Sequence, residues 1–342
     1  MWTYSAVVAA LLAMSGGLSS RPAAHNRISQ VTWTTDIEPM LKTRCVGCHR
    51  TDGFGPMSLA TYDEAKRSAK AIREEVLERR MPPWPAARGF GEFVNDRSLT
   101  PLEIDLLAAW ADGGTPIGPP VAAAHNGAVR PVDRPPDLVL TVPAHAVDAL
   151  NETFELPTGL VDRRWIAGWE FRPGNRSIVE QAVLRIVPAT LVAAWTPPEG
   201  PVMYPAGVAQ RLPAGSRLVL ELRYRKSATP QIDWSGVALY FRSRPAREVY
   251  HQSLRCGMTS IDRDVDVFAI TPRPLAAGES LEIVARRPDQ SVEPLCVVPR
   301  YAPEYPLTYR FRKSVRLDRG TVVHLRSSSP VCGADLDLAR AQ

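Results

Sequence analysis

The sequence lacks an apolar run of about 18 residues, which is the length that a membrane-spanning helix needs. We therefore expect no transmembrane segment. A shorter apolar run, residues 6–14, is followed by small residues and has the size of a secretory signal core. No lysine or arginine precedes it, and a disordered tail or a buried strand is the alternative. We predict a signal peptide over residues 1–25 and an exported protein.

A strong charge of one sign is also missing. The 41 basic and 36 acidic residues give a net charge of +5, and the arginines are scattered rather than grouped. This distribution is typical of a solvated surface, so we expect no nucleic-acid partner. The sequence supports no P-loop, no GxGxxG loop and no Ser–His–Asp order.

Cysteine is scarce, at five residues, yet two of them stand close together and precede a histidine. Cys45, Cys48 and His49 form the C-x-x-C-H pattern, in which two thiols add to the vinyl groups of haem and the histidine ligates its iron. Zinc would need two more ligands at similar spacing, and the other cysteines form no second pair. A thioredoxin-like dithiol would follow a strand, whereas "DIEPMLKTRC" is typical of a helix. The pattern predicts one covalently bound haem c.

A methionine is the expected second axial ligand of the haem iron. Met40 lies before the motif and Met57 shortly after it, whereas Met81 begins "MPPWP", where proline stiffens a loop that can carry sulfur to the opposite haem face. We predict Met81 as the distal ligand, with core packing as the alternative role of each methionine. Methionine ligation suits electron transfer, and an open site suits gas binding.

The residues after the motif offer a hydrogen-bond partner for the haem histidine. In "GFGP" we expect the backbone carbonyl of Gly55 or Pro56 to accept from the ring N–H of His49 and to fix its tautomer. Trp84 and Trp110 are candidates for packing at the haem edge, and ordinary core packing explains them equally well.

Residues 30–115 carry helix signals. Thr61 and Glu64 are spaced as a capping box, and Thr100 with Pro101 marks a second helix start. We therefore predict a helical haem-binding domain over this range.

The rest of the chain reads as β structure behind a linker. Residues 116–136 are rich in proline, glycine and alanine, which predicts a linker. Short alternating runs follow, as in antiparallel sandwiches. A weak repeat at an offset of 105 residues pairs "YPAGVAQRLPAGSRLVLELR" with "YRFRKSVRLDRGTVVHLRSS" and aligns Gly215 with Gly320. It predicts two related sandwiches in tandem, residues 137–250 and 251–342.

Several runs together carry a resemblance to a known family: "DIEPMLKTRCVGCH", "GPMSLATYDEAK", "RRMPPW" and "NDRSLTPLEIDLLAAWADGG". Residues 32–115 resemble the cytochrome c module of exported bacterial proteins in which it precedes a region similar to the copper type II, ascorbate-dependent monooxygenases, such as peptidylglycine hydroxylase. Looser matches continue through the chain. The resemblance implies a multi-domain fold, with a small all-α class I cytochrome c-like domain followed by all-β tandem sandwiches of the jelly-roll type. It also implies a periplasmic or otherwise exported location and supports Met81 as the axial ligand.

The copper ligands that the resemblance implies are replaced in this chain. Glu180 and Gln181 stand where the family has a histidine pair, and Arg223 stands where a strand carries a histidine. A guanidinium is a fixed cation that repels Cu²⁺, and one carboxylate is not a copper site. His251 and His324 occupy no matching position. We expect the β region to have lost its copper chemistry.

Three cysteines remain in the β region: Cys256, Cys296 and Cys332. In an exported protein we expect one disulfide among them, with the pairing open.

Three functions follow from these observations. The first is an exported c-type cytochrome that transfers single electrons through its haem, with a catalytically silent β region that docks a redox partner protein. The second is a copper-dependent monooxygenase-type oxidoreductase fed by the haem. The third is a haem-based sensor or scaffold subunit. We favour the electron-transfer protein over an enzyme, and the sequence does not identify a small-molecule substrate.

Overall fold

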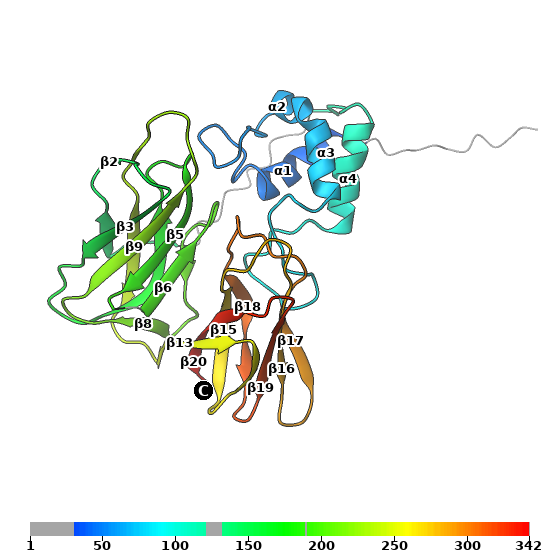
Figure 1. The fold of residues 1–342 in the computed structure, drawn as a ribbon. Coiled ribbons are helices and arrows are strands. Elements are labelled where there is room, and N and C mark those ends of the chain that lie inside the picture. The colour runs from blue at the N-terminus through cyan, green and yellow to red at the C-terminus, as the bar shows by residue number, and fades with distance from the viewer. Residues whose placement is uncertain (1–30, 121–131, 189, 342) are drawn as a thin grey trace, which may run out of the picture. The chain divides into compact units, whose positions relative to one another are not determined.

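The structure, a computed structural model, describes residues 31–120, 132–188 and 190–341, and strands predominate in them (Figure 1). The predicted signal peptide and most of the predicted linker lie outside these residues. The predicted domain boundaries stay predictions. No helix of the described ranges combines the length and the apolar character that crossing a membrane requires.

In the described residues, the helices all precede residue 113 and are short. Both predicted helix starts are confirmed: Thr61 caps α2 in a capping box with Glu64, and Thr100 caps α4 with Pro101 in its first turn. The helical elements are the π-helix η1 (Trp33–Ile37), α1 (Glu38–Arg44), α2 (Tyr62–Arg67), α3 (Ala69–Leu77) and α4 (Pro101–Asp112).

The expected fold class is wrong, because no separate small all-α domain precedes the sheets. Strands hold 39% of the described residues and helices 13%, in four short α-helices and one π-helical turn. The helices enclose a small core around Ile37, Leu107 and Trp110. The rest of the expected domain is not helical and joins the β structure instead.

The segment between α3 and α4 makes this join. Phe93 forms a β-bridge with Phe311, and the amide of Val94 donates to the carbonyl of Arg310 at 2.8 Å. Trp84 and Phe93 are buried in the hydrophobic core of the last sheets. Because these residues pack between strands, this segment belongs to the core of the last sheets and not to the small helical core.

The first β region contains two sheets with one core between them. Their strand orders are β1-β11-β4-β8-β12, with β7 paired to β4, and β3-β9-β5-β6. Strand β9 shows how the sequence builds this core: Leu218, Leu220 and Leu222 alternate with polar or exposed residues, so one face is buried. A two-stranded sheet, β2 with β10, lies beside them. The bounds are β1 (Leu138–Thr141), β2 (His145–Ala146), β3 (Asn151–Pro157), β4 (Arg164–Arg172), β5 (Val179–Ile186), β6 (Thr190–Trp195), β7 (Val202–Met203), β8 (Val208–Leu212), β9 (Arg217–Tyr224), β10 (Ile232–Asp233), β11 (Gly236–Arg242) and β12 (Arg247–Glu248).

The second β region repeats this plan with eight strands. Its sheets have the orders β13-β20-β15-β18 and β14-β19-β16-β17, and both contribute to one core. This is the strand order of a jelly roll, and eight strands of the first region follow the same order. The bounds are β13 (Tyr250–Arg255), β14 (Gly257–Ser260), β15 (Val265–Pro272), β16 (Leu281–Arg286), β17 (Val292–Val298), β18 (Tyr309–Leu317), β19 (Val322–Ser327) and β20 (Gly333–Arg340). We call the two regions the first and the second roll.

The segments aligned by the internal repeat occupy equivalent places in the two rolls. One covers β8 and β9, the other β18 and β19, and these strands hold the same positions in their sheet orders. Gly215 and Gly320 lie in the connecting turns with φ of 66° and 89°. A residue with a side chain rarely adopts such angles, which explains glycine at both positions.

The described cysteines of the β region pair in one way. Cys256 and Cys332 form a disulfide that joins residues beside β13 and β20, and Cys296 is a free, buried thiol in β17. The bridge closes a sequence separation of 76 residues.

We expect the double variant C256A/C332A to lose about 2–4 kcal/mol of unfolding free energy, because a crosslink over a long loop restricts the unfolded chain. Denaturant titration measures this loss. Reducing agent should destabilise the wild type and leave the variant unchanged. Titratable thiols at both positions in the non-reduced wild type would contradict the pairing.

Candidate functional site

The C-x-x-C-H motif forms a tight turn at the end of α1. Cys45 caps this helix, with its amide bonded to the carbonyl of Leu41 at 2.9 Å. The amides of Cys48 and His49 then both donate to the carbonyl of Cys45, at 3.0 and 2.8 Å. These bonds hold the two thiols and the imidazole within one turn of chain.

Two glycines let the following loop pass directly beneath the histidine. A Cβ on Gly55 would lie 2.4 Å from Nδ1 of His49, and one on Gly53 would lie 2.2 Å from the carbonyl oxygen of Cys48. The loop brings the carbonyl of Met57 to 3.2 Å from Nδ1 of His49. The hydrogen-bond partner of the His49 ring is therefore the carbonyl of Met57, and not that of Gly55 or Pro56 as predicted. The carbonyl that reaches the ring comes one residue after Pro56.

The motif opens into a pocket that also contains the predicted axial methionine. Met81 and Met57 both contribute to its wall, whereas Met40 packs in the helical core. Trp84 and Trp110 do not line it: Trp84 packs in the second roll and Trp110 in the helical core. The wall consists of Arg44, Cys45, Cys48, His49, Phe54, Gly55, Pro56, Met57, Leu59, Ala71, Ile72, Glu75, Val76, Met81, Pro82, Pro83, Arg97, Glu180, Pro197, Pro198, Arg225, Glu304 and Tyr305.

Burial favours the uncharged form of each group in the motif. It raises the pKa of Cys45 to about 12 and also raises the pKa of Cys48, while it lowers the pKa of His49. Neither thiol is in a disulfide. A neutral imidazole whose Nδ1–H donates to Met57 keeps a lone pair on Nε2, which has no partner among the described residues.

These residues fit a covalently attached haem. Such a group needs two free thiols one turn apart, an imidazole with an available ring nitrogen, and a soft donor for the opposite iron face. Cys45, Cys48, His49 and Met81 supply these four donors around one largely apolar pocket. Gly55 forms the floor under the imidazole, where a Cβ would displace the ring.

The first roll forms the far side of this pocket. Pro198 lies 3.2 Å from the place where a Cβ on Gly47 would stand, and Arg225 donates to the carbonyl of Phe54 at 3.0 Å. The ring of Phe54 belongs to the core of the first roll and meets Trp195 edge-on, with centroids 5.6 Å apart. The pocket is thus built jointly by the motif turn and the first roll.

The three positions at which the copper ligands were expected to be lost lie together beside this pocket. Gln181 pairs with Arg223 across β5 and β9, and Glu180 lies 3.5 Å from Nε of Arg223. Arg225 is 3.7 Å from the other oxygen of Glu180. An ion-paired guanidinium cannot donate a lone pair to a metal. Within the described ranges, no three His, Cys, Asp or Glu side chains gather as a metal site. The loss of copper stays a prediction.

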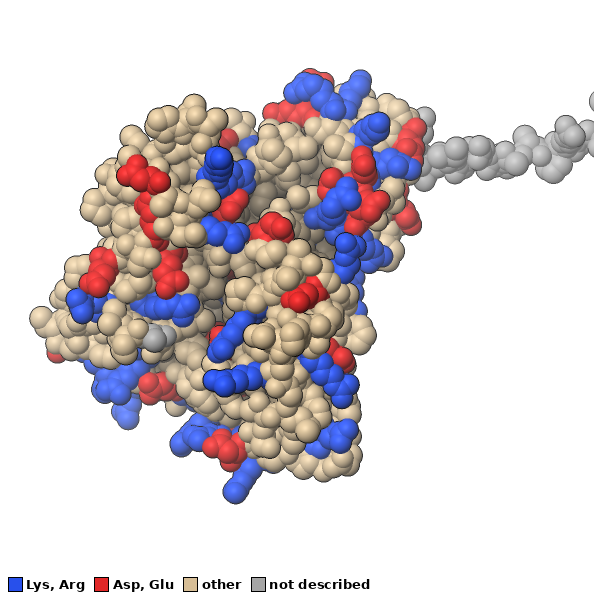
Figure 2. Space-filling model, in the orientation of Figure 1, with Lys and Arg blue, Asp and Glu red and all other residues tan. Residues whose placement is uncertain are grey.

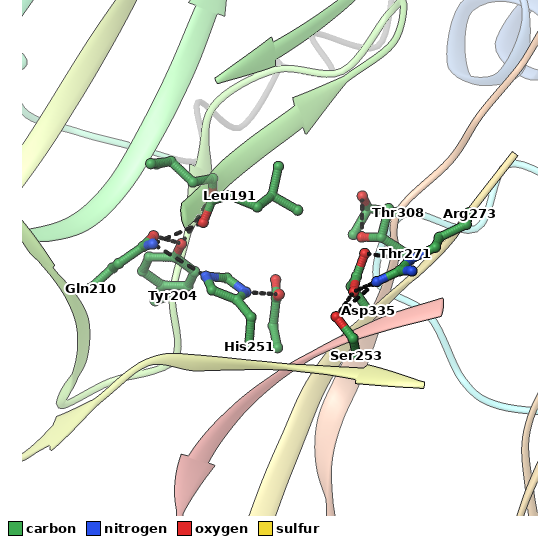
Figure 3. Close-up of polar contacts among 11 residues, drawn as sticks. Leu191, Tyr204, Gln210, His251, Ser253, Thr271, Arg273, Thr308 and Asp335 are labelled. Atoms are coloured by element: carbon green, nitrogen blue, oxygen red, sulfur yellow. Dashed lines mark hydrogen bonds and ion pairs between the residues drawn. The ribbon is translucent and has the colours of Figure 1, made fainter. Parts of the chain in front are cut away.

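A second polar cluster joins the two rolls and was not recognised from the sequence (Figure 3). Nδ1 of His251 lies 2.7 Å from Oδ1 of Asp337, and its Nε2 lies 3.2 Å from Nε2 of Gln210. The oxygen of Gln210 accepts from the hydroxyl of Tyr204 at 2.9 Å, and its nitrogen also donates to the carbonyl of Leu191. With His251 accepting at Nε2 and donating at Nδ1, every member is satisfied.

This cluster borders a cavity between the rolls. Tyr204 and Asp337 line the cavity, and burial raises the pKa of Tyr204. The sequence held one signal for it, since Gln210 is a polar residue that alternates with Val208 and Leu212 on the buried face of β8. That signal could not name His251 and Asp337, which lie on strands distant in sequence.

The charged surface is mixed in sign around these sites. Figure 2 shows Lys and Arg interspersed with Asp and Glu on the visible face. Many of the arginines have an acidic partner, as with Arg273 and Asp335 at 3.0 Å.

Comparisons with known proteins assign no family. No family model matches the chain, and no curated protein matches it. A Bacteroides ovatus protein assigned as an alpha-L-fucosidase is similar at 12% identity and a TM-score of 0.23, over 68% of this chain and 40% of that protein. A223, a turret protein of Sulfolobus turreted icosahedral virus, is similar at 12% identity and a TM-score of 0.18, over 60% of this chain and 99% of its own. Scores this low carry no argument about function, and the chain spans less than half of the first protein.

We expect Gly55→Ala to lower covalent haem incorporation roughly 10-fold or more, because the added Cβ displaces His49 from the Met57 carbonyl. Haem content per chain after periplasmic expression measures the effect. Gly200→Ala is the matched control, since a Cβ there meets nothing within 4 Å. Equal haem content in the two variants would show that the loop does not hold the imidazole.

We expect Gln210→Ala to cost about 1–3 kcal/mol of unfolding free energy, since it leaves Nε2 of His251 without its partner and the Tyr204 hydroxyl with only the longer bond to the carbonyl of Val192. Gln252→Ala is the control, because that side chain makes no hydrogen bond to the described residues and lies on the same strand as His251. A loss of unfolding free energy in Gln252→Ala as large as in Gln210→Ala would contradict the role of the cluster in holding the two rolls together.

Proposed function

We propose that this chain is an exported bacterial electron-transfer protein with one covalent haem c. Cys45 and Cys48 anchor the haem, and His49 and Met81 ligate its iron. The observation that carries the proposal is the convergence of these four side chains on one pocket, with the imidazole held by the Met57 carbonyl. When bound, the haem supplies one-electron oxidation and reduction.

The chain's own residues do three things for this chemistry. Met57 holds Nδ1 of His49, which orients the ring and leaves Nε2 toward the pocket. Pro82 and Pro83 restrict the backbone directly after Met81 and so limit where its sulfur can go. The apolar wall, with Phe54 and Ile72, keeps water from the site and lowers the cost of methionine as a ligand.

The β rolls serve in this proposal as a binding region for a redox partner protein. The ion-paired arginines at the expected copper positions support a region without copper chemistry. Residues 32–115 and the β runs resemble exported haem proteins that carry a monooxygenase-like region. This resemblance supports an origin of the β region from such a monooxygenase-like region. A partner is required in any case, because a single haem only passes on the electron that it receives.

The first experiment counts haem and copper on the full chain expressed with export. An alkaline pyridine spectrum should give one haem per chain, and metal analysis after copper loading and dialysis should give no stoichiometric copper. C45A/C48A should be colourless. A colourless wild type would contradict the haem proposal. Tightly retained copper would favour the copper-dependent monooxygenase-type oxidoreductase fed by the haem.

The axial ligand is tested by a second pair of variants. We expect Met81→Ala to lose the iron–methionine charge-transfer band of the ferric protein and to lower its reduction potential, because thioether ligation raises the potential. Met57→Ala should keep the band, since Met57 acts through its backbone carbonyl. Loss of the band in Met57→Ala but not in Met81→Ala would identify Met57, and not Met81, as the axial ligand.

A further inference from the structure

A cluster of three charged side chains lies between the haem-motif pocket and the two rolls. Glu199, after β6 in the first roll, pairs with Arg310 of β18 in the second roll, and their side chains are only 11% and 14% exposed. Arg97, from the segment before α4, donates from Nη1 to the carbonyl of Pro197 at 2.8 Å. The cluster therefore joins all three parts of the described chain.

Its charges do not balance. Burial raises the pKa of the Glu199 carboxyl, and the guanidiniums of Arg310 and Arg97 oppose that rise. Glu199 is hydrogen-bonded to Arg310, whereas Arg97 has a neutral carbonyl as its one hydrogen-bond partner among the described residues. One carboxylate thus serves two cations, so these three side chains together carry a net charge of +1.

That charge faces the haem motif. Arg97 lines the pocket together with Cys48 and His49. The bond to Pro197, whose neighbour Pro198 packs by the motif turn at Gly47, keeps the guanidinium there.

We propose that Arg97 is a positioning residue that acts electrostatically: its guanidinium, held by the carbonyl of Pro197, raises the reduction potential of the haem. This inference rests on the proposed function. A fixed, half-buried cation at the pocket wall favours the iron state with less positive charge, which is the ferrous state. The rolls thereby set the potential of the haem as well as offering a surface to a partner.

The test is the reduction potential of the haem-loaded full chain, measured by spectroscopic titration. We expect R97Q to lower the ferrous-to-ferric ratio at a fixed applied potential at least tenfold, or about 59 mV for one electron. E199Q should shift the potential upward, because it removes the negative charge of the cluster. R97K keeps the charge and should stay near the wild type, and the charge-conserving double variant R97Q/E199Q should return toward it.

Arg50 provides the matched control. It is exposed and directly follows His49, so R50Q removes the same charge where solvent screens it. A shift in R97Q no larger than in R50Q, or shifts of the same sign in R97Q and E199Q, would overturn the inference. If R97Q does not fold, the absence of an upward shift of the reduction potential in E199Q is sufficient to overturn the inference. A wild type without haem defeats the proposed function as well, which separates the two failures.

Discussion

The contact between the motif turn and the first roll is the constraint on which the rest of the site depends. Gly47 lies against Pro198, Arg225 holds the carbonyl of Phe54, and the ring of Phe54 is part of the first roll's core. The turn that presents Cys48 is therefore fixed from both sides, by α1 behind it and by the roll in front. A site built in this way cannot be moved without disturbing the packing of a large β core, which is how a scaffold keeps a cofactor pocket rigid.

This arrangement changes what the β region contributes. A β module attached by a flexible linker would influence a haem only by recruiting a partner. Here Pro197, Glu199 and Arg310 lie one contact away from a guanidinium of the pocket wall. In low dielectric, charges at such range would act directly on a haem in this pocket, because little water intervenes to screen them. Under the proposal, the β region then has an electrostatic role as well as a binding role.

The two rolls are joined by a polar network rather than by an apolar seam alone. His251 and Asp337 of the second roll meet Gln210 and Tyr204 of the first, and all of their hydrogen-bonding groups are satisfied in one tautomer of the histidine. Such networks specify one arrangement of the parts, since any slip leaves buried polar groups unpaired. The equivalent placement of β8–β9 and β18–β19 in the two rolls indicates that this join brings together two copies of one plan.

The sequence by itself determined those features whose causes are local. The spacing of Cys45, Cys48 and His49 places the three side chains within one turn of chain. The capping residues start α2 and α4, and the glycines at 215 and 320 mark equivalent turns. Only the tertiary structure decided the features that need distant residues. It drew Phe93 out of the expected helical domain into the second roll, because its ring found a larger apolar core there. It also decided the Cys256–Cys332 pair and brought Arg97, Glu199 and Arg310 together, since strand pairing and burial between residues far apart in sequence leave no local pattern in the chain.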